Sequence, residues 1–142
     1  MGNFYKRLFH SAEKPSQEYS DAPLDSPADL PKDLEESAQK NTELLKRKMN
    51  DTGDFVDRQL TVSGFRVDFI LIEGMFDGLL LTQALLDRIS RVKLPAGASA
   101  QELYDTLLNE MGLVGDVKET QNSDDVLNFI MSGFSAILVD GK

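Results

Sequence analysis

The stretch that most constrains the fold runs from Gly53 to Gly78 and reads GDFVDRQLTVSGFRVDFILIEGMFDG. It predicts a charged strand over about Phe55–Val62, then a short Ser63-Gly64 turn of the kind that closes an antiparallel hairpin. A second strand is expected over about Arg66–Glu73. The run from Phe69 to Ile72 within it is apolar on both faces, which is typical of a central strand covered on both sides.

In the first strand, Val56, Leu60 and Val62 share one face by the two-residue period of a strand, and Arg58 interrupts that face. A helix is expected ahead of the hairpin, from about Pro31 to Met49. Its early residues are acidic and its late residues basic, an order that complements the helix dipole. The acidic residues are Asp33, Glu35 and Glu36, and the basic ones are Lys46, Arg47 and Lys48.

Two more helices follow the hairpin. Asp77 is expected to cap a leucine-rich helix, which the Pro95-Ala96-Gly97 sequence then ends. Ser99 and Glu102 form a capping-box pattern at the start of the next helix. Gly112 suits the position just past its end, where a left-handed backbone is common.

A short helix over about Asp124–Ser132 leads into an aliphatic strand that begins near Phe134 and ends at Asp140-Gly141. A sheet edge of this kind usually has a partner. We therefore expect either a piece of a longer protein or an edge that another chain completes. The elements together predict an α/β fold: a small mixed sheet, made of an antiparallel hairpin plus a later strand, packed by about four helices.

The N-terminal residues 1–29 are expected to form a flexible arm and linker, because prolines and polar residues fill most of them. Residues 30–142 are expected to form the mixed α/β domain. The arm Met1–Lys14 carries three basic residues against one acidic residue, with aromatic residues and leucine between them. This composition allows a weak contact with a membrane surface.

Composition excludes several kinds of function. The net charge of −9 argues against nucleic-acid binding, because the surface repels phosphate backbones. The chain has no cysteine, and its only histidine, His10, has no nearby histidine or cysteine partner. Phosphate loops, dinucleotide fingerprints and nucleophile elbows are absent from the sequence. We expect neither an enzyme nor a bound cofactor or metal.

Charged residues are dense around the hairpin. One interpretation is a solvated face with ion pairs across neighbouring strands, each worth about 0–1 kcal/mol. The other is a surface for a partner or a small ligand, since open α/β sheets bind ligands near strand ends. The candidate binding residues are Asp54, Arg58, Arg66, Glu73, Gly74 and Asp77.

The order of these elements resembles the N-terminal region of spore-germination receptor A subunits, the GerA-type germinant receptors. The resemblance rests on Asn41-Thr42-Glu43-Leu44-Leu45, on Asp54 to Leu60, on Phe69 to Asp77 and on Phe129 to Gly141. It covers about Leu30 to Gly141. Met75-Phe76 and Glu73 depart from the usual pattern, which leaves subfamily and ligand open.

The resemblance implies a soluble module on the cytosolic, spore-core side of the spore inner membrane. It further implies that the module precedes a membrane domain, works with receptor B and C subunits and the rest of its own A subunit, and responds to a small nutrient ligand. Two alternatives stay open. One is a protein-interaction module that docks through the last strand or the charged hairpin, with no small-molecule ligand. The other is a hydrolase or transferase that uses Glu73 and Asp77.

Overall fold

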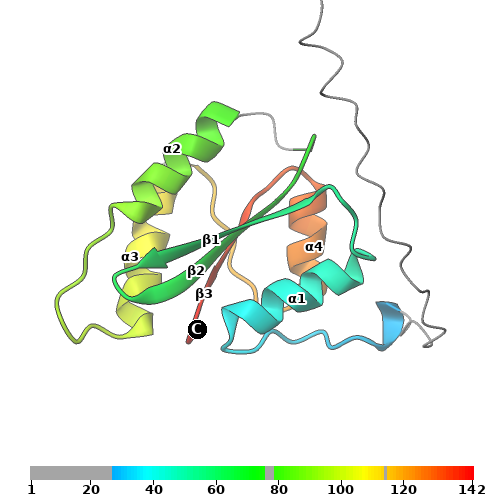
Figure 1. The fold of residues 1–142 in the computed structure, drawn as a ribbon, viewed down its shortest axis with the longest axis horizontal. Helices are drawn as coiled ribbons and strands as arrows, with labels where there is room; N and C mark the ends of the chain where they lie inside the picture. Colours follow the sequence, from blue (N-terminus) through cyan, green and yellow to red (C-terminus); the bar gives the residue numbers. More distant parts are fainter. Residues whose placement is uncertain (1–26, 76–78, 114) are drawn as a thin grey trace, which may run out of the picture.

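The computed structural model describes residues 27–75, 79–113 and 115–142 (Figure 1). The arm Met1–Lys14 lies outside these residues, so its membrane contact stays a prediction. In chain order the elements are η2 (Pro27–Asp29), α1 (Ala38–Lys48), β1 (Phe55–Val62), β2 (Phe65–Ile72), α2 (Leu79–Ser90), α3 (Ala100–Gly112), α4 (Ser123–Met131) and β3 (Ala136–Val139).

The three strands form one sheet in the order β1-β2-β3, and both pairings are antiparallel. The predicted hairpin is confirmed, with β2 beginning one residue earlier than expected, at Phe65. Ser63 and Gly64 both adopt positive φ angles, 50° and 88°, as a tight turn between twisted strands requires. The aliphatic strand β2 is central, so the predicted α/β fold with a small sheet and four helices is confirmed.

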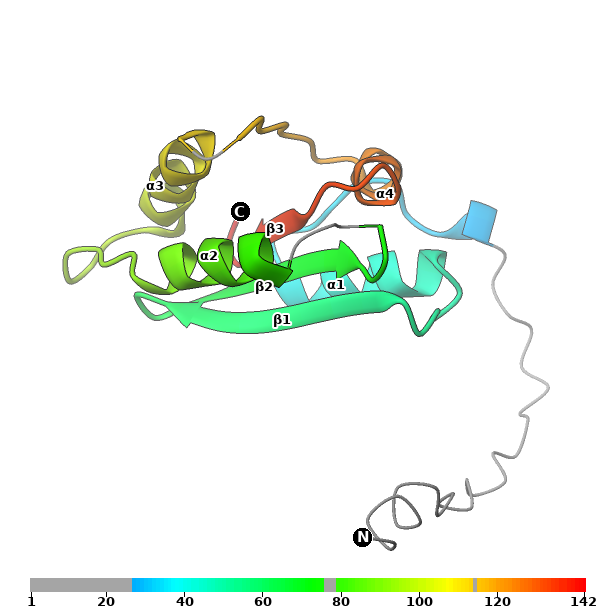
Figure 2. The same cartoon turned by 90° about the horizontal axis from the view of Figure 1, so that it is seen from above.

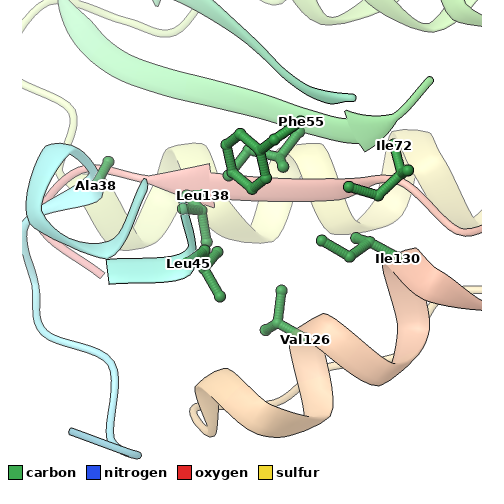
Figure 3. Packing of buried hydrophobic residues seen from close by; sticks show 8 residues of the cluster. Ala38, Leu45, Phe55, Ile72, Val126, Ile130 and Leu138 are labelled. Atoms are coloured by element: carbon green, nitrogen blue, oxygen red, sulfur yellow. The ribbon is translucent and has the colours of Figure 1, made fainter. Parts of the chain in front are cut away.

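Helices cover the sheet on both faces. Figure 1 shows α2 and α3 on one side and α1 and α4 on the other. Side chains that alternate along each strand therefore enter two separate clusters. The α1/α4 cluster contains Ala38, Leu45, Phe55, Ile70, Ile72, Val126, Ile130 and Leu138 (Figure 3). The α2/α3 cluster contains Val62, Val67, Phe69, Ile89, Leu103, Leu107, Met111 and Val139.

The first helix is shorter than predicted, because α1 begins at Ala38 and not near Pro31. Asn41 explains the difference. Its side-chain oxygen accepts from the Glu35 amide at 2.8 Å, and its side-chain nitrogen donates to the Glu35 carbonyl at 2.6 Å. This pairing holds Glu35 outside the helix, and Ser37 serves as the N-cap. The predicted acidic first turn is therefore wrong, while the basic last turn is confirmed.

Residues 31–34 run beside the start of α4 instead of joining α1. The Leu34 amide donates to the Gln121 carbonyl at 2.8 Å, and the Ser123 amide donates to the Lys32 carbonyl at 2.7 Å. An isolated bridge joins Asp33 to Asn122. The chain thus uses this segment to tie α1 to α4.

The remaining helix ends agree in part with expectation. The capping box of Ser99 and Glu102 is present at the start of α3. Gly112, however, is the last residue of that helix and Leu113 is its C-cap, so the predicted glycine cap is wrong. Asp77 lies outside the described residues, and its predicted capping of α2 stays a prediction. In the described ranges, no helix combines the length and hydrophobicity needed to cross a membrane.

Candidate functional site

A cavity of about 810 Å³ lies along the edge of β3 that faces away from β2. Its boundary is formed by β3, by α3, by residues 115–121 and by residues 34–36 ahead of α1. Figure 2 shows the connection from α3 to α4 passing beyond β3, on the opposite side from β2. The cavity therefore occupies the place where a fourth strand would extend the sheet. We call it the β3-edge cleft.

Two apolar walls enclose the β3-edge cleft. Leu107, Leu108 and Met111 of α3 line one wall, and Val126 and Phe129 of α4 line the other. These two helices pack on opposite faces of the sheet. The cleft thus has apolar surface above and below the plane of the strands, as the interior strands of a covered sheet have.

The rim of the cleft is acidic. Five acidic residues line it, against two lysines, so acids outnumber bases by three. The acids are Glu35, Glu36, Asp105, Asp116 and Glu119, and the lysines are Lys118 and Lys142. A cationic or basic occupant is therefore favoured electrostatically over an anionic one.

The main chain of β3 turns alternate groups toward the cleft. The Asp140 amide donates to the Arg66 carbonyl of β2 at 3.0 Å. Hydrogen-bonded pairs alternate in an antiparallel ladder, so the main-chain amides and carbonyls of Leu138 and Ala136 also point toward β2. Those of Ile137 and the amide of Val139 point away from β2, toward the cleft. Within the described ranges, the outward amide and carbonyl of Ile137 have no hydrogen-bond partner.

Tyr104 also lines the cleft. Its hydroxyl donates to Glu119 Oε2 at 2.6 Å, which ties α3 to the 115–121 segment. Burial raises the pKa of Tyr104 to about 12, and the hydrogen bond to Glu119 adds to the shift. Lys142 Nζ lies 5.5 Å from the centre of the ring, within the range of a cation–π contact. Tyr104 is therefore a neutral hydrogen-bond donor at physiological pH.

A buried polar network fixes β2 to α1. Asp68 is 1% exposed, and its Oδ2 accepts from Thr42 Oγ1 at 2.7 Å. Arg66 donates to both carboxylate oxygens of Asp68, at 2.8 and 2.9 Å. The hydrogen bond to Asp68 raises the pKa of Arg66 further above its ordinary value. Because every carboxylate oxygen is paired, this network is structural.

The turn after β3 joins the same region. Asp140 Oδ1 accepts from the Ala38 amide at 3.0 Å, so it caps the first turn of α1. The Gly141 amide donates to the Glu36 carbonyl at 2.6 Å. Gly141 has a φ of 85°, and a Cβ there would lie 3.0 Å from the Ala100 side chain. The end of β3 nearest α1 is therefore tightly held.

Ser123 and Lys48 lie close enough to suggest a nucleophilic pair. Lys48 Nζ lies 2.8 Å from Ser123 Oγ and 2.6 Å from Asp124 Oδ1. The Ser123 hydroxyl, however, is fully buried and lies 2.8 Å from the Lys32 carbonyl, which it is placed to donate to. A substrate has no access to such a hydroxyl. Lys48 lowers the pKa of Asp124 through the hydrogen bond, and the group ties α1 to α4.

The predicted binding residues do not come together. Asp54, Glu73 and Gly74 lie at the open end of the hairpin, where the Glu73 amide donates to the Asp54 carbonyl at 2.8 Å. Arg66 lies near the other end, on the α1 side.

Arg58 lies in the middle of β1, on the face of the sheet opposite to that of Arg66. Asp77 lies outside the described residues. The binding roles of these residues stay predictions. Ion pairs across the strands were also expected, but Arg66 pairs with Asp68 of its own strand.

Sequence reasoning missed Asp68 as a buried residue and missed the β3-edge cleft. A signal for Asp68 was present, because an acid inside an otherwise apolar central strand needs a partner. The cleft carried no local signal, since its walls come from helices separated in sequence. Among the described residues, no group of three or more histidines and carboxylates is arranged to hold a metal ion.

Comparison with solved structures finds a likeness in fold. The fold is similar to the crystal structure of the N-terminal domain of the A subunit of the Bacillus megaterium spore germinant receptor GerK3. The TM-score is 0.54 at 18% sequence identity, over 78% of this chain and 89% of that chain. No family model matches this chain, and no curated protein matches it. At this identity the likeness establishes a shared fold.

Proposed function

We propose that this domain is the N-terminal module of a spore germinant receptor A subunit and takes part in nutrient-triggered germination, by ligand sensing or signal coupling. The observation that carries the proposal is the fold shared with a receptor domain of that kind over most of both chains. The residue order from Asn41 to Gly141 supports it independently, because that resemblance uses sequence alone.

In this proposal the module lies on the cytosolic side of the spore inner membrane and contacts the rest of its own A subunit and the B and C subunits. It has no catalytic role. The buried state of Ser123 and the fully paired carboxylate of Asp68 are consistent with a module that binds and does not catalyse.

The test is genetic and is made in the spore former that carries this chain. Removing residues 30–142 in frame is expected to abolish germination in response to nutrient, measured as the fall in optical density of a spore suspension. A trigger that bypasses the receptors should still germinate these spores. Unchanged nutrient germination after the deletion would show that the domain has no such role.

A second candidate is an interaction module with no small-molecule ligand. The β3-edge cleft favours it, because the outward main-chain groups of Ile137 have no hydrogen-bond partner among the described residues, as at a sheet edge that can accept a strand. Calorimetric titration of the chain with amino acids, sugars and nucleosides separates the candidates. Binding of one of these nutrients supports ligand sensing, and no binding together with loss of germination in the deletion supports the interaction module.

A further inference from the structure

We propose that the β3-edge cleft receives an extended segment of another polypeptide, apolar at its centre and basic at its ends, which pairs with β3 as a fourth strand. This proposal deepens the interaction form of the proposed function and rests on it. Its test measures binding by the isolated chain, so its outcome is independent of the germination result.

The first step is the free main chain of β3. Ile137 presents its amide and carbonyl toward the cleft, and the Val139 amide points the same way. Strand addition satisfies such groups with main-chain hydrogen bonds and leaves side-chain pockets to give specificity. The neighbouring strand in a sheet lies about 4.8 Å away, and the cavity begins at this edge.

The second step is the pair of walls. A strand inserted here has α3 on one face and α4 on the other, so its side chains on both faces meet apolar surface. Leu108 and Phe129 are both half-buried and face this space from opposite sides. The occupant therefore needs a continuous apolar run, as β2 has, and not an alternating polar pattern.

The third step is charge. The rim has an excess of three acidic residues, so an occupant with basic flanks gains from long-range attraction. A second copy of this chain is disfavoured, because each copy carries a net charge of −9. The arm Met1–Lys14 is disfavoured as well, since Lys6 and Arg7 interrupt its apolar residues.

The test uses the full chain and a synthetic peptide with a Val-Ile-Val-Ile centre and two lysines at each end. Binding is followed by nuclear magnetic resonance, with amide hydrogen exchange as the structural readout. The peptide is expected to slow exchange at Ile137 and Val139 while leaving the β1 amides unchanged. The same peptide with glutamates at its ends should bind at least about tenfold more weakly. Added salt should reduce this difference in affinity between the two peptides.

A proline substitution provides the matched control. Ile137→Pro removes the outward amide without removing a hydrogen bond between β3 and β2. It should lower the affinity for the lysine-ended peptide by about tenfold. Thr61→Pro removes an outward amide from the opposite edge and should leave the affinity unchanged. Each variant is first checked for a native spectrum. The double variant Glu36→Gln with Asp116→Asn keeps the backbone intact and should lower the affinity for the lysine-ended peptide several-fold.

The other occupants give distinct results. The Ile137 amide could already be protected from exchange in the free chain and lose that protection in the double variant Phe4→Ser with Phe9→Ser. In that case the arm is the occupant and the proposal is wrong. Protection that rises with protein concentration, together with a dimer in sedimentation, assigns the edge to a second copy and also overturns it. The proposal fails equally if neither this peptide nor strands selected from a displayed peptide library protect Ile137.

Discussion

The two edges of the sheet are built in different ways. The β1 edge is eight residues long, and its middle residues Asp57, Arg58 and Gln59 are exposed and polar. The β3 edge is four residues long and apolar, and it opens into a cavity between two helices. Charged residues discourage an edge from pairing with another chain. The difference indicates that β1 is protected against strand addition, whereas β3 is left able to accept a strand.

The largest expected effect comes from the strand that the two edges share. Phe69 of β2 is 0% exposed and belongs to the α2/α3 cluster. Phe69→Ala should destabilise the domain by about 3–5 kcal/mol, because it leaves a large cavity in the core. Urea unfolding followed by circular dichroism measures the change. A loss below about 1 kcal/mol would show that this core is loosely packed.

A smaller effect should distinguish the two edges. Asp68→Ala leaves Thr42 and Arg66 without their shared partner. We expect a loss of about 2–3 kcal/mol, below the usual value for a broken buried pair because the Arg66 side chain is 26% exposed and water replaces part of the interaction.

Because α1 is also capped by Asp140, amide exchange in Asp68→Ala should rise more at Leu138 than at Arg58. Asp57→Ala, an exposed acid on the same face, is the control and should change stability by less than about 0.5 kcal/mol. Equal acceleration at both edges would contradict a specific link to β3.

The protection of β1 is tested by making this edge resemble β3. Asp57→Val with Gln59→Val replaces two exposed polar residues by β-branched apolar ones. Each substitution should change the free energy of unfolding by no more than about 0.5 kcal/mol, but the chain should begin to self-associate through the exposed edge. Sedimentation velocity detects the new species. A variant that stays monomeric would mean that charge is not what protects β1.

The smallest effect concerns Tyr104 in the β3-edge cleft and appears only at high pH. The pKa of Tyr104 is raised to about 12, so the folded state favours the neutral phenol. Its contribution to stability is complete below the ordinary tyrosine pKa of about 10 and is lost as the pH rises toward about 12. Near-ultraviolet absorbance should show one late-titrating phenol that Tyr104→Phe removes. Titration of every phenol near pH 10 would contradict the contact with Glu119.

The parts of the fold that sequence predicted are those with local causes. The hairpin depends on the turn at Ser63-Gly64 and on strand periodicity, and the start of α3 depends on the capping box. The start of α1 was misplaced because Asn41 reaches back six residues to Glu35, a contact that competes with helix formation. Such competition is invisible to a pattern of apolar spacing.

The candidate site was harder to predict than the fold. Charged residues that are neighbours in sequence were separated, because a strand advances about 3.3 Å per residue and turns successive side chains to opposite faces. Arg58 and Arg66 therefore ended on different faces of the sheet. The β3-edge cleft depends on how far α3 and α4 extend past the last strand, which is a property of tertiary packing. Only the open edge itself was foreseen.

The sequestered amine of Lys48 gives the molecule an internal reporter. Its side chain is 4% exposed, whereas that of Lys40 on the same helix is 67% exposed. An amine-reactive reagent should therefore label Lys40 at once and Lys48 only when α1 and α4 separate. The ratio of the two labels, read by mass spectrometry, measures how often this half of the domain opens in the native state. A partner that acts through these helices would change that rate without touching the lysine itself.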